Sequence, residues 1–489
     1  MAAGAVVEEI PPAETGPVAR YLLPDNASIG SDGSLAIGGV SAEELAERFG
    51  TPLFVYDEDH LAARCRATYE AFGEGAAYAT KAFLCKAMAR VAAGEGLRLD
   101  VSSAGEMYLA LAAGVSPAKL VLHGSNKSEE ELELALSAGV GRIVVDSFDE
   151  LARLGELARR PRTMGGGGAG HGGGTRAAAP GCQGGKRGGD RSGHRLQPVM
   201  LRVNPGIEAH THEYVRTGQA DSKFGFSAEG GGAIRAAEMV AATSGLALAG
   251  LHAHIGSQIF DVEHFEEEVE VLADLAAAIH APTERDRGRP RGADAGLEPF
   301  EVCIGGGLGV AYLSSERAPT IAEWASVVIA AAARHGLAGM ANVTAEPGRA
   351  IVATAGMTIY KIGTIKEIPG IRTYISVDGG MSDNPRPVLY GSGYEAFLAG
   401  QAASPRPFAA RVVGKHCESG DIVVENARLP DNVSVGDLLV TPVTGAYGYS
   451  MASNYNKVPR PAVVFVSSGE ARVVVERESL EDMTRLDRD

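Results

Sequence analysis

A lysine and a glutamate end two apolar segments that have the composition of buried strands. Lys81 ends the segment AAYATK, and Glu346 ends the segment ANVTAE, shortly before Arg349. A lysine in this position either extends its ammonium group to solvent or lies in a pocket where its amine can form an imine. Glu346 and Arg349 form either a structural ion pair or part of a ligand site. The lysine is thus the candidate for covalent chemistry, and the other two are candidates for binding charged groups.

Glycines and histidines follow two further apolar segments. The loop Gly305–Gly307 either cradles a phosphate with its backbone N–H groups or forms a tight turn, and it lacks the spacing of a Rossmann or P-loop motif. His252 and His254 place two imidazoles on one face of a strand, but no third ligand in register is evident, so we expect no metal site. A lysine amine, a phosphate loop, a flat imidazole and a carboxylate are together what pyridoxal 5′-phosphate (PLP) needs. These residues therefore predict PLP as the cofactor.

The elements that must position these residues alternate along the chain. Short apolar segments, typical of buried parallel strands, are separated by segments rich in Ala, Leu and Glu that are typical of helices. The expected strands are 76–80, 97–103, 119–125, 142–147, 198–205, 248–257, 300–307 and 341–348. The expected helices include 85–95, 104–113, 128–138, 149–160, 231–243, 262–280 and 321–335. This alternation predicts an α/β fold built on a (β/α)8 barrel of the TIM type.

In such a barrel the active site lies at the C-terminal ends of the strands. The unusual residues of this sequence stand at those ends, and we expect them to lie close together. They are Lys81, Ser102, Ser103, His123, Asp146, Arg202–Asn204, His254–Ser257, Gly305–Gly307 and Glu346–Arg349.

The chain changes character beyond residue 350. Segments such as GMTIYKIGTIKEI and PAVVFVSSG alternate in the manner of strands and are separated by Gly, Pro and Asp turns. The early segment 21–41 has the same character. We therefore predict a poorly ordered N-terminus over 1–20, strands over 21–45 that join a β-rich sandwich or barrel domain, the (β/α)8 barrel over 46–350 and the β domain itself over 351–489.

Two segments interrupt the predicted barrel. Residues 163–195 are rich in glycine and are expected to be disordered, whereas 282–299 is expected to be a loop insertion. Each segment follows a helix and precedes a strand. We therefore expect both at the N-terminal end of the barrel, away from the active site.

Composition narrows the class of protein. The 489 residues include 45 Lys and Arg and 61 Asp and Glu, a formal net charge of −16, which argues against a nucleic-acid partner. The sequence contains neither a run of 18 apolar residues nor a signal peptide, so we expect no membrane association. The five cysteines form no C-x-x-C pair, which favours a reducing compartment. We therefore expect a cytoplasmic protein.

The motifs in their order resemble those of the diaminopimelate decarboxylases. These belong to the barrel-type PLP-dependent family that also includes ornithine and arginine decarboxylases and alanine racemase. The resemblance extends over about residues 45–480 and rests on YATKAF, DVSSAGE, HGSNKS, LRVNPG, KFGF, HAHIGSQI, GGGLG, EPGR, DNPRPVLY, CESGD and GAYGYSMASNYN. The inserts 163–195 and 282–299 depart from the family pattern without touching a motif. The resemblance implies a PLP-dependent carboxy-lyase.

The resemblance also implies roles for individual residues. Lys81 carries the cofactor, and His254 stacks on its ring. Glu346 pairs with the pyridine nitrogen and keeps it protonated, which makes the ring a strong electron sink. Tyr447 closes over cofactor and substrate. The phosphate is bound by Ser257, Gly305, Gly306, Gly307, Gly348 and Arg349.

Cys417, in the segment CESGD, matches the proton donor of the family. In the family this cysteine reaches the site from the partner subunit, so the resemblance implies a homodimer with shared active sites. An isolated cysteine in a β domain is otherwise usually a small core residue. Its role as the acid therefore rests on the resemblance.

Charge indicates which amino acid the site takes. Meso-diaminopimelate carries a second amino-acid head with one carboxylate and one ammonium. Arg386 and Tyr390, together with Arg349, can fork the distal carboxylate. Glu418 can take the distal ammonium, and Tyr447 can close over the substrate. This mixed set favours decarboxylation of meso-diaminopimelate to L-lysine, the last step of lysine biosynthesis.

Three alternatives stay open. The first is a related decarboxylase of the carboxynorspermidine or arginine/ornithine type. The second is an amino-acid racemase on the same fold, which Glu346 disfavours because such racemases have an arginine at that place. The third is a catalytically inactive regulatory homologue, which the presence of both Lys81 and Cys417 disfavours.

Overall fold

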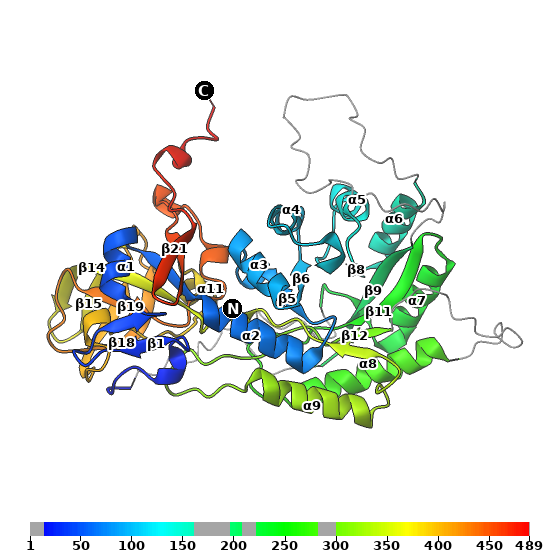
Figure 1. Cartoon of the computed structure of the whole chain (residues 1–489), viewed down its shortest axis with the longest axis horizontal. Helices are drawn as coiled ribbons and strands as arrows, with labels where there is room; N and C mark the ends of the chain where they lie inside the picture. Colours follow the sequence, from blue (N-terminus) through cyan, green and yellow to red (C-terminus); the bar gives the residue numbers. More distant parts are fainter. Residues whose placement is uncertain (1–13, 161–195, 208–221, 282–299, 489) are drawn as a thin grey trace, which may run out of the picture.

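The computed structural model describes residues 14–160, 196–207, 222–281 and 300–488. Figure 1 shows two domains side by side, with the barrel helices α3 to α9 in one and most of the later strands in the other. The predicted inserts 163–195 and 282–299 and the first 13 residues lie outside the described ranges. Across the ranges described, no helix has the length and apolar character needed to cross a membrane.

The eight expected barrel strands are all present. They lie parallel in the order β13-β12-β11-β9-β8-β7-β6-β5, and a short strand β10 (Phe226–Ser227) also pairs with β9. The N–H of Ala77 donates to the carbonyl oxygen of Ala345 at 2.9 Å, which nearly closes the sheet into the predicted barrel. The strands are β5 (Ala77–Ala79), β6 (Arg98–Val101), β7 (Leu120–Leu122), β8 (Arg142–Val145), β9 (Gln197–Asn204), β11 (Leu246–His252), β12 (Glu301–Cys303) and β13 (Asn342–Thr344).

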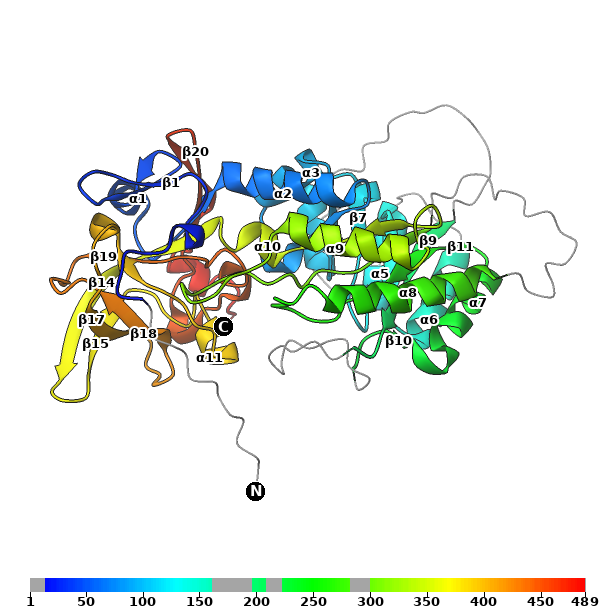
Figure 2. The same ribbon diagram turned by 90° about the horizontal axis from the view of Figure 1, so that it is seen from below.

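The expected helices are also present, together with α2, for which no helix was predicted. Side chains of Ser103, Ser128, Ser147 and Thr320 accept the N–H three residues later and so fix where four of these helices begin. Figure 2 shows α2, α9, α8 and α7 along the outside of the barrel. The helices are α2 (Glu58–Phe72), α3 (Lys86–Gly94), α4 (Ala104–Ala112), α5 (Glu129–Ala138), α6 (Phe148–Arg159), α7 (Gly232–Ala242), α8 (His264–His280) and α9 (Ile321–Arg334).

The second domain is built on a sheet in the order β18-β17-β15-β14-β4-β20-β21, with β19 pairing with β14 and β16 with β19. Two short helices, α10 (Arg349–Val352) and α11 (Arg386–Tyr390), lie before and within this part of the chain. The strands are β4 (Leu53–Asp57), β14 (Gly356–Ile368), β15 (Arg372–Val377), β16 (Phe397–Leu398), β17 (Phe408–Val413), β18 (Ile422–Leu429), β19 (Leu438–Thr441), β20 (Ala462–Ser467) and β21 (Glu470–Val475).

The position of β4 differs from the expected domain boundary at residue 46. This strand pairs with β14 in antiparallel fashion and with β20 in parallel fashion, so it belongs to the second sheet. All five of its residues are buried, and it is followed by a helix, which is the pattern of a barrel strand. No strand was predicted over 53–57, and the local pattern of this segment does not indicate which strands it pairs with. The barrel is therefore inserted in the chain between β4 and β14, two neighbouring strands of the other domain.

The N-terminal segment packs on the second sheet without joining it. Strands β1 (Ala27–Ile29), β2 (Leu35–Ile37) and β3 (Val40–Ser41) form an antiparallel sheet of their own, followed by α1 (Ala42–Phe49). Their apolar side chains share a core with Val55 of β4 and Ile359 of β14. Within the segment 1–20, expected to be poorly ordered, the carbonyl oxygens of Thr15 and Gly16 accept hydrogen bonds from Arg406 at 2.6 and 2.8 Å.

The two domains meet beside Lys81. Tyr56 of β4 stacks on Phe83, with ring centroids 4.4 Å apart, and Phe83 follows the 3-10 turn Thr80–Ala82 that contains Lys81. Both rings belong to a core that includes residues of both domains. The second domain therefore supports the turn that presents Lys81.

Candidate active site

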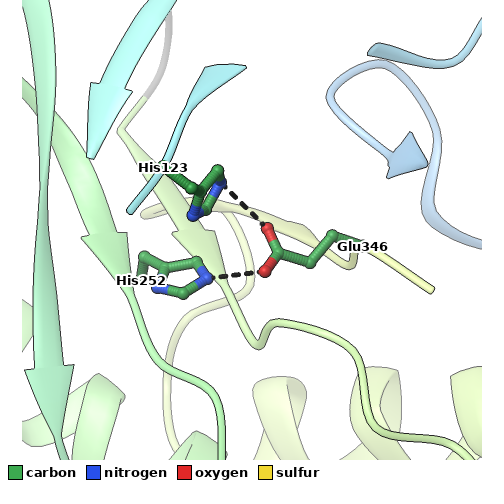
Figure 3. Close-up of side chains that lie close together, drawn as sticks. All are labelled: His123, His252 and Glu346. Carbon is green, nitrogen blue, oxygen red and sulfur yellow. Dashed lines mark hydrogen bonds and ion pairs between the residues drawn. The ribbon is translucent and has the colours of Figure 1, made fainter. Parts of the chain in front are cut away.

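Glu346 follows β13 at the C-terminal end of the barrel, where the ends of β7, β11 and β12 also converge. Its Oε1 lies 2.8 Å from Nε2 of His252, at the end of β11, and its Oε2 lies 3.3 Å from Nε2 of His123, just after β7. Figure 3 shows both imidazoles pointing to the carboxylate. The Cys303 thiol, at the end of β12, also contacts Oε2 at 3.6 Å. The predicted convergence of strand-end residues is thus present around Glu346.

His123, His252 and Glu346 could together serve as metal ligands, because their ligand atoms all lie within 4.8 Å of one another. In the sequence, His252 and His254 lack a third ligand in register. The structure instead places His252 beside His123 and Glu346. Nε2 of His252 hydrogen-bonds Oε1 of Glu346, whereas Nε2 of His123 lies 3.3 Å from Oε2 without a hydrogen bond. The absence of a metal site stays a prediction.

A second carboxyl group, that of Asp100 in β6, lies next to His123. Its Oδ1 is 3.4 Å from Nε2 of His123. Burial raises the pKa of Asp100 well above its usual range, and the charge of Glu346 raises it further. Burial also opposes ionisation of Glu346, but His252 and His123 outweigh it and hold the pKa of Glu346 well below its usual range. Glu346 is therefore ionised beside a protonated Asp100.

His254 lies two residues beyond the end of β11 and faces the glycine loop. Its Nδ1 accepts the N–H of Gly306 at 3.2 Å. Burial, together with the positive charge of Lys81, lowers the pKa of His254 well below its usual value. The imidazole is therefore neutral, with its Nδ1 lone pair directed at the loop. A flat, neutral ring near Lys81 is suited to stacking on an aromatic cofactor.

The loops after β12 and β13 approach other backbone so closely that side chains do not fit. A Cβ on Gly306 would lie 2.6 Å from the Glu346 carbonyl oxygen, and one on Gly348 would lie 2.9 Å from that of Ala79. Gly305 and Gly307 have φ values of +66° and +107°, which favour glycine. These loops are tight turns with close backbone packing, and such a turn can also direct backbone N–H groups at a phosphate, so the two interpretations of the glycine loop are compatible.

Arg349 joins the glycine loops to the second domain. Its Nη2 donates to Oγ of Ser257 at 2.9 Å and its Nη1 donates to the hydroxyl of Tyr312 at 2.7 Å. Its guanidinium also lies over the ring of Tyr447, 4.8 Å from the centroid. The N–H of Tyr447 donates to the Ala82 carbonyl oxygen at 2.8 Å, next to Lys81. The structure therefore brings these predicted residues together.

Arg386, at the start of α11, is buried near Arg349. Its Nη1 donates to the hydroxyl of Tyr394 at 2.7 Å, and its guanidinium lies 4.4 Å from the ring centroid of Tyr312. The Nε atoms of both arginines are buried without a hydrogen-bond partner. Neither arginine forms an ion pair with any residue in the described ranges. Arg349 is therefore not in an ion pair with Glu346, and the two cations are available to an anionic ligand.

Cys417 and Glu418 are exposed on the turn between β17 and β18. The N–H of Cys417 donates to Oδ1 of Asn456 at 3.1 Å. The carboxylate of Asp421 accepts the N–H groups of His416 and Met381 at 2.8 and 2.6 Å, which fixes the turn. Among the described contacts of this single chain, none joins these two residues, or the half-buried Tyr390, to the cluster around Lys81.

Three residues of the site had no predicted role. His123 was expected at a strand end, but nothing in the sequence paired it with Glu346. Asp100 is a lone acid within the apolar segment LRLDVSS, which could have marked it as a buried polar group. Tyr312 lies five residues after Gly307, and only tertiary structure shows that it contacts both arginines.

The donor set fits the group expected from the sequence. Lys81 is exposed and forms no hydrogen bond or ion pair with described residues. Around it lie a neutral imidazole, an ionised carboxylate, a glycine loop and a guanidinium with a free Nε. These are the amine, stacking partner, nitrogen partner and phosphate donors that PLP requires.

Comparison with known proteins agrees with this geometry. Residues 58–353, which form the barrel inserted between β4 and β14, match the family model described as pyridoxal-dependent decarboxylase, pyridoxal binding domain. Diaminopimelate decarboxylase of Mycobacterium tuberculosis is 43% identical over 96% of this chain and 98% of its own length. That of Bacillus subtilis is 42% identical over 93% of this chain and 95% of its own.

Comparison with solved structures also finds similarity to a diaminopimelate decarboxylase. The diaminopimelate decarboxylase of M. jannaschii, solved in complex with L-lysine, superposes with a TM-score of 0.79 at 31% identity and covers 95% of this chain and 98% of its own. The family match confirms the predicted PLP chemistry, and the structural match confirms the predicted barrel with its β domain. The chain therefore belongs to the diaminopimelate decarboxylase family of pyridoxal-dependent decarboxylases.

Proposed function

We propose that this chain decarboxylates meso-2,6-diaminopimelate to L-lysine and CO2. The observation that supports this substrate is the pair of buried guanidinium groups of Arg349 and Arg386, which have no carboxylate partner among the described residues. A substrate with a purely cationic tail, such as ornithine, would need carboxylates in their place. Meso-diaminopimelate has a distal carboxylate that complements them. The M. jannaschii relative, solved with L-lysine, supports the same assignment.

The residues around Lys81 hold the cofactor and set its charge. When bound through Lys81, PLP supplies the electron sink for the bond that breaks at Cα. The ionised carboxylate of Glu346 would pair with the pyridine nitrogen and hold a proton there. His254 would stack on the ring, and Ser257, Arg349 and the glycine loops would bind the phosphate. Protonated Asp100 adds no second negative charge behind Glu346.

Substrate recognition and protonation use residues from the second domain. Arg386, Tyr390 and Arg349 hold the distal carboxylate, and Glu418 takes the distal ammonium. After CO2 leaves, the Cys417 thiol donates its proton to Cα. Cys417 and Glu418 are exposed on a turn fixed by Asp421, which supports their use by a second subunit. We therefore propose a homodimer in which each subunit completes the site of the other. The cytoplasmic location stays a prediction.

CO2 release from meso-diaminopimelate, measured with and without added PLP, tests this function. We expect PLP-dependent release that yields L-lysine, with little release from ornithine, arginine or carboxynorspermidine. Preferential turnover of one of these would instead identify a related decarboxylase. A purified protein with no visible cofactor absorbance and no turnover would identify an inactive homologue.

Arg386→Lys tests how the distal carboxylate is recognised. Lysine keeps the charge but has no planar fork, so kcat/KM for meso-diaminopimelate should fall by about tenfold or more. If the variant bound this substrate normally, Arg386 would not be the residue that recognises the carboxylate.

A further inference from the structure

Tyr312 contacts both arginines that lack a carboxylate partner. Its hydroxyl accepts a hydrogen bond from Nη1 of Arg349 at 2.7 Å, and the guanidinium of Arg386 lies over its ring, 4.4 Å from the centroid. Tyr394 packs edge-on against Tyr312, with centroids 5.2 Å apart, and its hydroxyl accepts from Nη1 of Arg386 at 2.7 Å. The two tyrosines are 4% and 2% exposed, so both are fixed by packing.

We propose that Tyr312 and Tyr394 are positioning residues that aim Arg349 and Arg386 at the distal carboxylate of the substrate. This inference rests on the proposed function. Each phenol accepts one N–H of a guanidinium and so fixes its orientation. Because a phenol is neutral, it leaves the positive charge and the other donors of the fork for the ligand.

Arg406 shows the alternative arrangement in the same part of the fold. Its guanidinium is 1% exposed, and its Nη1 donates to Oε2 of Glu395 at 2.8 Å, so a buried carboxylate neutralises it. Arg349 and Arg386 are similarly buried but have hydroxyl partners instead. The contrast shows that a buried arginine in this fold does not need a tyrosine hydroxyl as its partner, because a carboxylate can neutralise it. Hydroxyl partners are found at the two arginines that are proposed to meet the substrate.

The Glu395–Arg406 pair also holds the two tyrosines together. Glu395 follows Tyr394 directly, and its Oε1 accepts the N–H of Ser314 at 2.6 Å, two residues after Tyr312. One buried carboxylate therefore ties the loop after β12 to the segment after α11. The ring of Tyr312 lies against both cations, and its negative face offsets part of their mutual repulsion.

The test is a comparison of ligands with and without the distal carboxylate in the PLP-loaded enzyme. L-lysine, the product, keeps this carboxylate, whereas cadaverine lacks it. In Tyr312→Phe, which loses the hydroxyl but keeps the ring, KM for meso-diaminopimelate and Ki for L-lysine should each rise about tenfold. The value of kcat should stay within about twofold, and Ki for cadaverine should not change. Tyr312→Leu removes the ring as well, so both constants should rise further.

Tyr394→Phe repeats the test on Arg386, and it decides the proposal if Tyr312 variants do not fold. Tyr69→Phe, on the outer helix α2 where Tyr69 is 38% exposed, is the matched control and should leave every constant unchanged. Equal losses for L-lysine and cadaverine, or unchanged KM and Ki in both phenylalanine variants, would overturn the proposal. A wild-type enzyme inactive on meso-diaminopimelate would instead overturn the proposed function, so the two failures are distinguishable.

Discussion

The carboxyl groups of the buried Asp100 and the partly buried Glu346 reach the same atom, Nε2 of His123, at 3.4 and 3.3 Å. Their environments move their pKa values in opposite directions. Burial and the neighbouring charge keep Asp100 protonated, whereas the imidazoles of His252 and His123 keep Glu346 ionised. The pair therefore carries one negative charge, and it is located on Glu346, the carboxylate proposed to meet the pyridine nitrogen.

Glu346→Gln should lower kcat by about a hundredfold or more, because the amide carries no charge to hold the pyridinium proton. The amide oxygen can still accept from one histidine, so cofactor absorbance should persist. Asp100→Asn is the matched control: it replaces a neutral acid with a neutral amide and should cost far less activity. Similar kcat values for wild type and Glu346→Gln would mean that the nitrogen partner lies elsewhere.

Lys81→Ala should abolish both turnover and the visible absorbance of the bound cofactor, because the amine that carries PLP is lost. Borohydride reduction of the wild type followed by peptide mapping should place the label on Lys81. Lys86→Ala, which changes another exposed lysine five residues later, should retain both properties. A label on any other lysine would contradict the assignment.

Cys417→Ala and Lys81→Ala, each inactive alone, should complement each other on mixing. With equal amounts and free subunit exchange, half of the dimers contain one chain of each kind. In such a dimer one site receives both defects and the other receives neither, so about a quarter of wild-type activity should return. Failure to recover activity despite demonstrated exchange would place Cys417 in the site of its own chain.

Deletion of residues 165–193 should leave kcat/KM within about twofold of the wild-type value. This segment lies outside the described residues, but its flanks are the end of α6 at Arg159 and the start of β9 at Gln197. Both flanks lie at the end of the barrel opposite to the site. A large kinetic loss in a variant that folds normally would show that the segment reaches the active site.

His60 should make the stability of the protein depend on pH. It is 1% exposed, its Nδ1 accepts the N–H of Asp25 at 2.9 Å, and burial lowers its pKa to about 4. Between this value and the ordinary pKa of about 6.5, the unfolded chain binds a proton that the folded chain does not. The free energy of unfolding is therefore not reduced by His60 above pH 6.5, and it falls as the pH drops from 6.5 towards 4.

At pH 5 this loss amounts to roughly 2 kcal/mol relative to pH 7.5. His60→Asn keeps an acceptor for Asp25 but removes the titration. Chemical denaturation at the two pH values should show a drop in unfolding free energy that is smaller in the variant by this amount. An equal drop in both proteins would exclude His60 as its source.

The barrel could be predicted because its evidence is local. Each parallel strand is a short apolar run buried on both faces, and each ends in a residue such as Lys81, His123 or Glu346 that stands out from that run. The role of β4 could not be predicted, because an apolar run indicates a strand without indicating its partners. Its pairing with β14 and β20 depends on contacts between distant parts of the chain.

The site divides in the same way. Glu346 and His254 were predicted as site residues from residue type and position at strand ends. The partners of Arg349 were not, because proximity in EPGR suggested Glu346 whereas the folded chain supplies Ser257 and Tyr312. These partners lie on separate loops whose approach is set by the packing of the barrel against the second domain. Residue type thus indicates what a side chain can do, and tertiary structure decides what it contacts.

The placement of the barrel between β4 and β14 constrains the order of folding. Tyr56 pairs with Gly356, roughly 300 residues later, and closing a flexible loop of that length costs about 5 kcal/mol. Once the barrel has formed, its two ends are adjacent, because the N–H of Asp57 donates to the carbonyl oxygen of Ala355 at 2.9 Å. We therefore expect the barrel to fold first and to template the central strand pair of the second sheet. A fragment that begins at residue 356 lacks β4 and would leave β14 and β20 without the strand that joins them.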